Sequence, residues 1–168
     1  MEYKLKSISK EGIPEALAKA ELYRYLNEPE ESESICRDIL TTDPNQQLAI
    51  RVLGLSLTDQ FLGAVTDRNR EAEEIFARLV DPYERLYYTG LLYERRAKAQ
   101  LRTGQLPHAL LPLIEKALQC FAEAEKIRPA GNDDAILRWN RCVRMIQTPN
   151  FEWEEQLASY EAEDTPPS

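Results

Sequence analysis

The sequence has few of the residues that build catalytic or metal sites. It contains one histidine, His108, and three cysteines with no CxxC pair, and it has no GxxxxGK or GxGxxG phosphate loop. A metal site needs several His, Cys or carboxylate ligands in register, and nucleophilic catalysis needs a nucleophile beside a base. His108 follows a proline and is expected at a loop or helix start. We therefore expect a protein that is not an enzyme and that uses no metal and no cofactor.

Glycine is also scarce, with six in 168 residues. The chain has no Asn-Gly or Asp-Gly hairpin turn and no long alternation of apolar and polar residues, so there is little room for a β-sheet. The residue types that favour helices, Ala, Leu, Glu, Arg and Gln, predominate over Val and Thr. The length suits one domain or one short solenoid. We expect an all-α fold.

Long apolar runs are missing as well. No run approaches the roughly 20 residues of a membrane span, and residues 1–6 lack an apolar core of signal-peptide length. The net charge is −8, and six acidic side chains after residue 148 account for all but two of these charges. This acidic balance argues against nucleic acid or a membrane as the partner. An odd number of widely spaced cysteines suits free thiols, so we expect a cytoplasmic protein.

What the chain does contain is a triplet of residues that recurs three times. Each triplet runs at i, i+4 and i+7, which is one stripe of an α-helix, and a proline follows each one. The triplets are Ser32/Cys36/Ile39, Ala72/Phe76/Leu79 and Ala117/Phe121/Ala124, and the prolines are Pro44, Pro82 and Pro129. Repeated helix pairs of this kind bury their apolar faces by stacking on one another.

Apolar periodicity, prolines and capping residues predict seven helices. Five of them have expected ranges, which are about 14–27, 30–41, 68–79, 82–103 and 108–127. The third helix carries Leu48, Val52, Leu53, Leu55, Leu57 and Phe61, and the seventh carries Ala135, Leu137 or Trp139, Cys142, Val143 and Ile146. Short connections make neighbouring helices antiparallel. Pro112 either opens or bends the sixth helix, and the sequence leaves the start of that helix open.

These features resemble the tetratricopeptide repeat, a helix-turn-helix unit of about 34 residues. The matching positions are Ala20, Tyr23, Ser32 and Asp43-Pro44-Asn45 in the first unit, Leu53-Gly54 in the second, and Ala117, Phe121, Ala124 and Pro129 in the third. The resemblance implies an antiparallel helix-hairpin solenoid over residues 13–147, wound as a right-handed superhelix and closed by a capping helix. Residues 1–12 are then an extension and residues 148–168 an acidic tail.

The second and third hairpins are longer than the family unit. Twelve residues separate Ala20 from Ser32, but eighteen separate Gly54 from Ala72 and twenty separate Ala97 from Ala117. The extra residues either lengthen the helices or form loops.

In this family the first helix of each pair lines a concave face, which usually receives a peptide or a partner's helix. The resemblance therefore implies a non-catalytic protein-protein interaction module. Its expected groove residues lie on the exposed side of those first helices, counted from the motif positions. They are Leu17, Glu21, Arg24, Tyr25, Arg51, Leu55, Thr58, Asp59, Glu94, Lys98, Leu101 and Arg102. An alternative is a small acidic assembly or secretion chaperone that holds partially folded clients. The sequence allows a homo-oligomer but does not indicate one.

One family role is disfavoured by the sequence. Repeats that bind the C-terminal carboxylate of heat-shock chaperones use a Lys and an Asn on the first inner helix, and Leu17 and Glu21 stand at the matching positions. A glutamate there repels a carboxylate.

Aromatic residues form two further groups. Tyr83, Tyr87, Tyr88 and Tyr93 are expected to pack between repeats, with an exposed tyrosine edge for protein contact as the alternative. In the tail, Trp153, Leu157 and Tyr160 follow Phe151 at helical spacing and predict a short amphipathic acidic helix. We expect Phe151 and Trp153 to dock on the open end of the stack, and a free interaction arm is the alternative.

Overall fold

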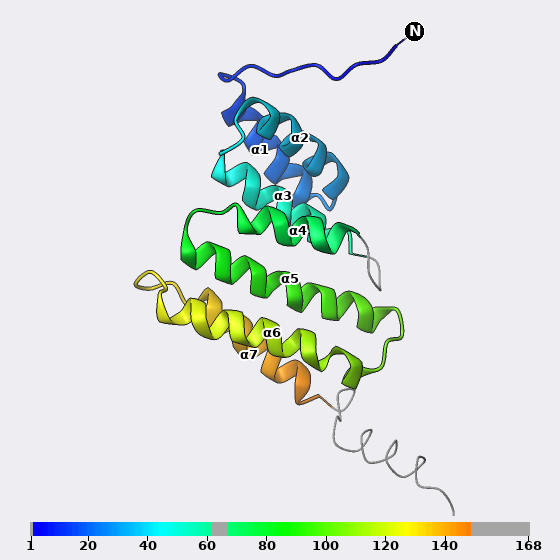
Figure 1. Cartoon of the computed structure of the whole chain (residues 1–168), viewed down its shortest axis with the longest axis vertical. Coiled ribbons are helices and arrows are strands. Elements are labelled where there is room, and N and C mark those ends of the chain that lie inside the picture. Colours follow the sequence, from blue (N-terminus) through cyan, green and yellow to red (C-terminus); the bar gives the residue numbers. More distant parts are fainter. Residues whose placement is uncertain (1, 62–66, 149–168) are drawn as a thin grey trace, which may run out of the picture.

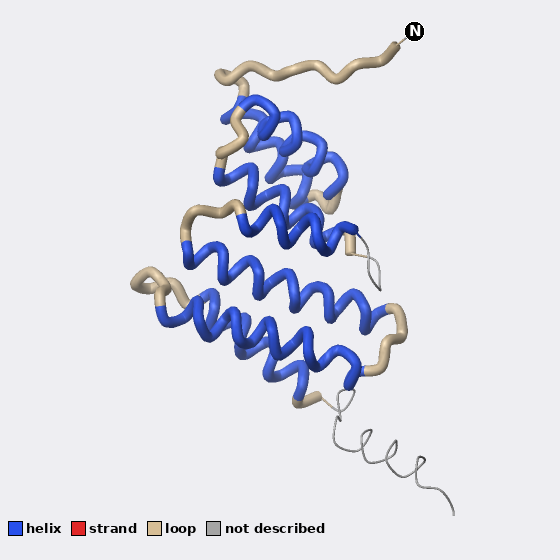
Figure 2. Tube along the Cα trace, viewed as in Figure 1, coloured by secondary structure: helices blue, strands red, loops and turns tan. Residues whose placement is uncertain are grey.

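The computed structural model describes residues 2–61 and 67–148. Over these ranges the fold is all-helical, with seven helices and no strand (Figure 1, Figure 2). The helices are α1 (Ile13–Tyr25), α2 (Pro29–Thr42), α3 (Gln47–Asp59), α4 (Asp67–Ala77), α5 (Pro82–Arg102), α6 (Pro107–Lys126) and α7 (Asp134–Ile146). The prediction of an all-α fold is confirmed. The predictions for the acidic tail lie outside the described residues.

For α1, α2, α4 and α5 both ends lie within two residues of the predicted ranges, and so does the end of α6. Pro29, Pro82 and Pro107 are the first residues of their helices, where a missing N–H costs nothing. The Asp81 carboxylate accepts a hydrogen bond from the Tyr83 N–H at 2.8 Å and so caps α5. Pro112 lies inside α6, in its second turn, so it does not begin the helix.

The three sequence triplets form the buried stripes of α2, α4 and α6, with Leu79 two residues beyond the end of α4. All nine side chains are at most 1% exposed. The list is Ser32, Cys36, Ile39, Ala72, Phe76, Leu79, Ala117, Phe121 and Ala124. The periodicity therefore identified the core-facing side of the second helix in each pair correctly.

Two glycines let helices approach each other closely. A Cβ on Gly54 would lie 2.2 Å from Cε1 of Phe76, and a Cβ on Gly90 would lie 2.7 Å from Cε1 of Phe121. Gly54 is one of the positions that match the repeat pattern. In the third hairpin the expected spacing was counted from Ala97, but the glycine that lies against a phenylalanine is Gly90, seven residues earlier. The α5–α6 pair is long because the extra residues lengthen both helices.

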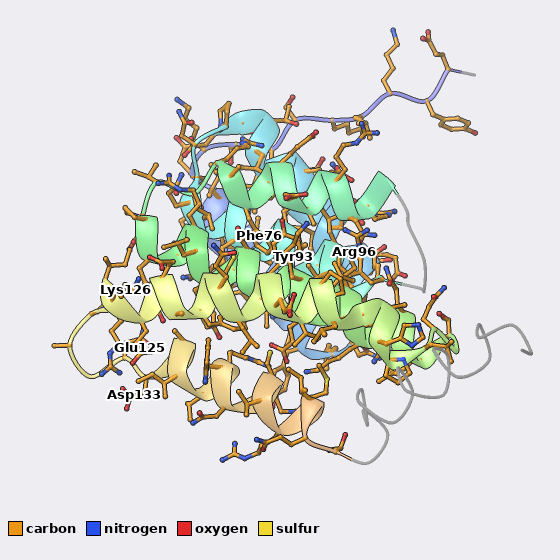
Figure 3. All side chains as sticks on the ribbon, turned by 60° about the horizontal axis from the view of Figure 1, so that its bottom comes forward. Phe76, Tyr93, Arg96, Glu125, Lys126 and Asp133 are labelled. Atoms are coloured by element: carbon orange, nitrogen blue, oxygen red, sulfur yellow. The ribbon has the colours of Figure 1, made fainter. Side chains whose placement is uncertain are left out.

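Two tyrosines of α5, Tyr87 and Tyr88, pack between these two phenylalanines. The Tyr88 ring stacks on Phe76 with 5.6 Å between centroids, and the Tyr87 ring lies 6.0 Å from Phe121. Tyr83 is buried and the other three are half-buried, so packing accounts for this group and an exposed tyrosine edge is not formed. Figure 3 shows Phe76 and Tyr93 inside the helix stack, while Glu125, Lys126 and Asp133 lie at its periphery.

The helices stack in chain order, with α1 and α2 at one end and α6 and α7 at the other (Figure 1). Each helix packs against the next, and α1 with α3, α3 with α5 and α5 with α7 are also in contact. The odd-numbered helices therefore form one continuous layer. In α7 the buried residues are Ala135, Cys142 and Met145, so the expectation that Leu137 or Trp139 faces the core is wrong: these side chains are 62% and 37% exposed.

Candidate functional site: a cationic pocket on the odd-numbered helices

A pocket of about 400 Å³ opens on the layer of odd-numbered helices. Its lining comes from the end of α1, the end of α3, the second half of α5 and the middle of α7. The eight lining residues are Arg24, Asn27, Thr58, Asp59, Arg95, Lys98, Arg102 and Arg138. All eight are polar or charged, five are cationic and one is anionic. We call this site the cationic pocket.

Asp59 holds two of the five cations in place. Its Oδ2 lies 2.7 Å from Nε of Arg24, and its Oδ1 lies 2.5 Å from Nη1 of Arg95. Nη1 of Arg95 also donates to the Thr58 hydroxyl at 2.7 Å. The Asp59 and Arg95 side chains are 23% and 24% exposed, which limits screening by solvent. One carboxylate therefore ties α1, α3 and α5 together at the pocket wall.

Glu94 holds two more cations from inside the fold. Its side chain is fully buried, and its Oε1 accepts a hydrogen bond from Nζ of Lys98 on the same helix. Nη1 of Arg138 on α7 lies 3.5 Å from the same oxygen. A buried carboxylate without positive partners costs free energy of folding. The ion pairs with Glu94 therefore hold Lys98 and Arg138 against the helix stack.

Arg102 completes the pocket and contacts no carboxylate within the described residues. Five cations therefore face two carboxylates, Asp59 and Glu94, which leaves an excess of three positive charges. Burial lowers the pKa of the Arg95 guanidinium, and the charges of Arg24 and Arg138 lower it further, against the opposing effect of Asp59. The neighbouring cations thus repel one another, and an anion in the pocket would relieve that repulsion.

Five of the twelve predicted groove residues line this pocket. They are Arg24, Thr58, Asp59, Lys98 and Arg102. Glu21 and Tyr25 are exposed on α1 outside the pocket lining. Arg51 forms an ion pair with Glu84 at 2.7 Å and does not reach the pocket.

The other four predicted groove residues are Leu17, Leu55, Glu94 and Leu101, which lie in or against the core, and Thr58 of the pocket wall is buried as well. Leu17 is 8% exposed and belongs to the core between the first helices, and Leu55 and Leu101 pack against the two larger core clusters. Thr58 and Glu94 are 4% and 0% exposed. The expectation that Leu17, Thr58 and Glu94 lie on an exposed surface is therefore wrong, because the neighbouring helices cover these positions.

Three pocket residues were missed from the sequence: Asn27, Arg95 and Arg138. A signal for one of them existed, because Arg95, Lys98 and Arg102 are spaced i, i+3 and i+7 and form one cationic stripe along α5. Arg138 gave no such signal, since α7 was expected only to cap the stack.

The other reactive side chains lie in the core. Burial raises the pKa of the Cys36 and Cys142 thiols to about 12 each, and both are fully buried. Cys120 is half-buried, and burial also raises its pKa. His108 is the second residue of α6, as expected for a helix start. The described residues hold no group of three or more His, Cys, Asp or Glu side chains arranged for a metal ion.

Comparisons with protein-family models, with curated proteins and with solved structures found no match to this chain. Within the described ranges, every helix is too short or too polar to cross a membrane. The cationic pocket and the layer of helices that builds it are the features of the described residues that bear on function.

Proposed function

We propose that this protein is a non-catalytic interaction module that binds an acidic segment of a partner protein in the cationic pocket. The single observation that carries the proposal is the excess of three positive charges in a polar pocket of about 400 Å³. A segment with two or three neighbouring carboxylates would complement this excess. Most of the cations are already fixed, so few side chains need to be ordered on binding.

The arrangement of the helices supports a tetratricopeptide-like solenoid as the scaffold of this module. The buried triplets, the contact between Gly54 and Phe76 and the continuous layer of α1, α3, α5 and α7 agree with such a stack. In that architecture the odd-numbered helices are the first helices of each pair, followed by the cap. The pocket then lies on the face that receives a partner segment.

The polar lining favours a docking site over the chaperone alternative. A chaperone for partially folded clients needs an extended apolar surface. Another pocket, of about 360 Å³, is partly apolar, with Ile8, Ala16 and Ile35 in its wall, but Glu15, Lys19 and Asp38 share that wall. The charged pocket is thus the more specific feature of the described surface.

The test uses a fluorescein-labelled octaglutamate peptide and fluorescence anisotropy at low salt. Arg102→Glu is the informative variant, because Arg102 is exposed and holds no other charge in place. We expect about tenfold weaker binding, equivalent to about 1.4 kcal/mol. Arg144→Glu is the matched control, since Arg144 is exposed on α7 outside the pocket lining and the change in charge is the same.

Added salt should weaken binding by the parent protein and have less effect on the Arg102→Glu variant, because the contacts are between partly exposed charges. Equal affinity of the parent and the Arg102→Glu variant would overturn the proposal. So would equal affinity of the parent for octaglutamate and for an octaglutamine peptide.

A further inference from the structure

The cationic pocket lies on the side of the helix stack on which α7 ends. The Tyr83 hydroxyl donates to Oδ1 of Asn132 at 3.1 Å just before α7, and Arg138 approaches Glu94 halfway along α5. α7 and α5 therefore run in the same direction (Figure 1). The end of α7 lies towards the end of α5, where Arg102 contributes to the pocket.

The chain that follows α7 is long enough to return to the pocket. Arg138 lies eight residues before Ile146, which is about 12 Å along the helix axis. Three carboxylates, Glu152, Glu154 and Glu155, follow Thr148 by four to seven residues. An extended chain of that length spans about 14 to 24 Å at roughly 3.4 Å per residue.

The charges of this segment match those of the pocket. The pocket has an excess of three positive charges, and residues 152–155 carry three negative charges and no positive one. A short flexible connection gives an attached segment an effective concentration in the millimolar range. Even a weak contact is therefore populated when the segment belongs to the same chain.

We infer that residues 152–155 of this chain occupy the cationic pocket and compete there with the acidic segment of a partner. This inference rests on the proposed function, because it uses the same pocket. The tail then sets a minimum affinity for partner binding, since a partner segment must be acidic enough to displace the carboxylates of residues 152–155.

The tail itself supplies a matched control. Glu161, Glu163 and Asp164 form a second group of three acids, 13 to 16 residues after Thr148. Both groups carry the same charge over the same length, so neutralising either one changes the net charge equally. Effective concentration falls roughly as the three-halves power of the connecting length, which makes the nearer group about fourfold more concentrated at the pocket.

The first measurement compares two full-length variants with the parent, using the labelled octaglutamate peptide. Neutralising the near group, as Glu152→Gln, Glu154→Gln and Glu155→Gln, should strengthen peptide binding about 2.3-fold, for effective concentrations of about 1 mM (near group) and about 0.25 mM (far group) and a dissociation constant of about 0.5 mM for either contact. Neutralising the far group, as Glu161→Gln, Glu163→Gln and Asp164→Asn, should strengthen it only about 1.2-fold. Equal effects of the two variants would overturn the inference.

The second measurement needs no partner peptide. Trp153 stands among the three near acids, and Trp139 is the other tryptophan of the chain. With Trp139→Phe as the background, acrylamide quenching reports on Trp153 alone. Docking in the pocket predicts that Arg102→Glu and added salt both increase the quenching of Trp153, while Arg144→Glu does not.

The two measurements separate the two hypotheses. Quenching that responds to Arg102→Glu without any binding of octaglutamate supports the tail contact and rejects the proposed function. The opposite result is octaglutamate binding that depends on Arg102, together with Trp153 quenching that is unchanged by Arg102→Glu and by salt. That result rejects the tail contact and keeps the proposed function.

Discussion

Replacing Gly54 with alanine is the most direct perturbation of the helix packing. The new Cβ would lie 2.2, 2.7 and 2.7 Å from three atoms of the Phe76 ring. Carbon atoms in contact are normally about 3.5–4.0 Å apart, so the ring or the helix must move by more than about 1 Å. The Phe76 ring cannot turn aside freely, because it is fully buried and stacked on Tyr88.

Two opposing terms set the size of the effect. Overpacking of a dense core costs about 1–3 kcal/mol, and the contact here is at the severe end of that range. Alanine is better than glycine in a helix interior by about 0.5–1 kcal/mol. We therefore expect Gly54→Ala to lower the free energy of unfolding by about 1–2 kcal/mol, which corresponds to a fall in melting temperature of about 2–8 °C for a chain of this size.

The assay is urea denaturation followed by circular dichroism, with Gln119→Ala on α6 as the control. Gln119 is exposed, so its replacement should change stability by less than about 0.5 kcal/mol. A double-mutant cycle with Phe76→Ala isolates the contact, because Gly54→Ala should no longer destabilise once the ring is gone. The reasoning fails if Gly54→Ala is neutral in the parent, or if its cost persists in the Phe76→Ala background.

Two further predictions concern buried ionisable groups. A thiol reagent should label native Cys36 and Cys142 slowly, because burial raises the pKa of both thiols to about 12, and half-buried Cys120 should react first; equal rates for all three would contradict this order. Burial raises the pKa of Glu33, but hydrogen bonds from Gln60, Arg37 and Arg68 outweigh it, so the net pKa is below the ordinary 4.5. A lowered carboxyl pKa stabilises the fold fully above about pH 4.5 and progressively less as the pH falls through the lower folded value. Glu33→Gln should therefore destabilise the protein by about 1–3 kcal/mol at pH 7, and urea denaturation at pH 3 should show a much smaller loss; an undiminished loss at pH 3 would count against this reasoning.

The sequence predicted the parts of the fold that depend on local pattern. Residues such as Cys36, Phe76 and Phe121 repeat at i+4 from a small residue, and periodicity alone determines which side of a helix they occupy. Proline and aspartate predicted the start of α5 for an equally local reason, since both act within one turn.

The sequence did not predict several of the residue contacts between helices. Gly90 was missed because the contact with Phe121 joins residues 31 positions apart in a lengthened hairpin, and the family spacing pointed to Ala97 instead. Glu94 was placed on an exposed face because its own helix gives no sign that α7 covers it. Arg138 was missed for the same reason, since only the packing of α7 on α5 brings it to Glu94.

The two carboxylates of the cationic pocket explain how so many positive charges can share a small volume. Asp59 lies between Arg24 and Arg95 at the pocket wall, and Glu94 lies inside the fold between Lys98 and Arg138. Replacing a buried ion pair with apolar residues is often neutral or stabilising, so such a pair is weak support for stability by itself. Here the two carboxylates fix the positions of the cations, because the four long side chains that pair with them lose their conformational freedom when the protein folds. An acidic ligand then meets cations that are already ordered, and only Arg102 among the pocket cations remains to be fixed when the ligand binds.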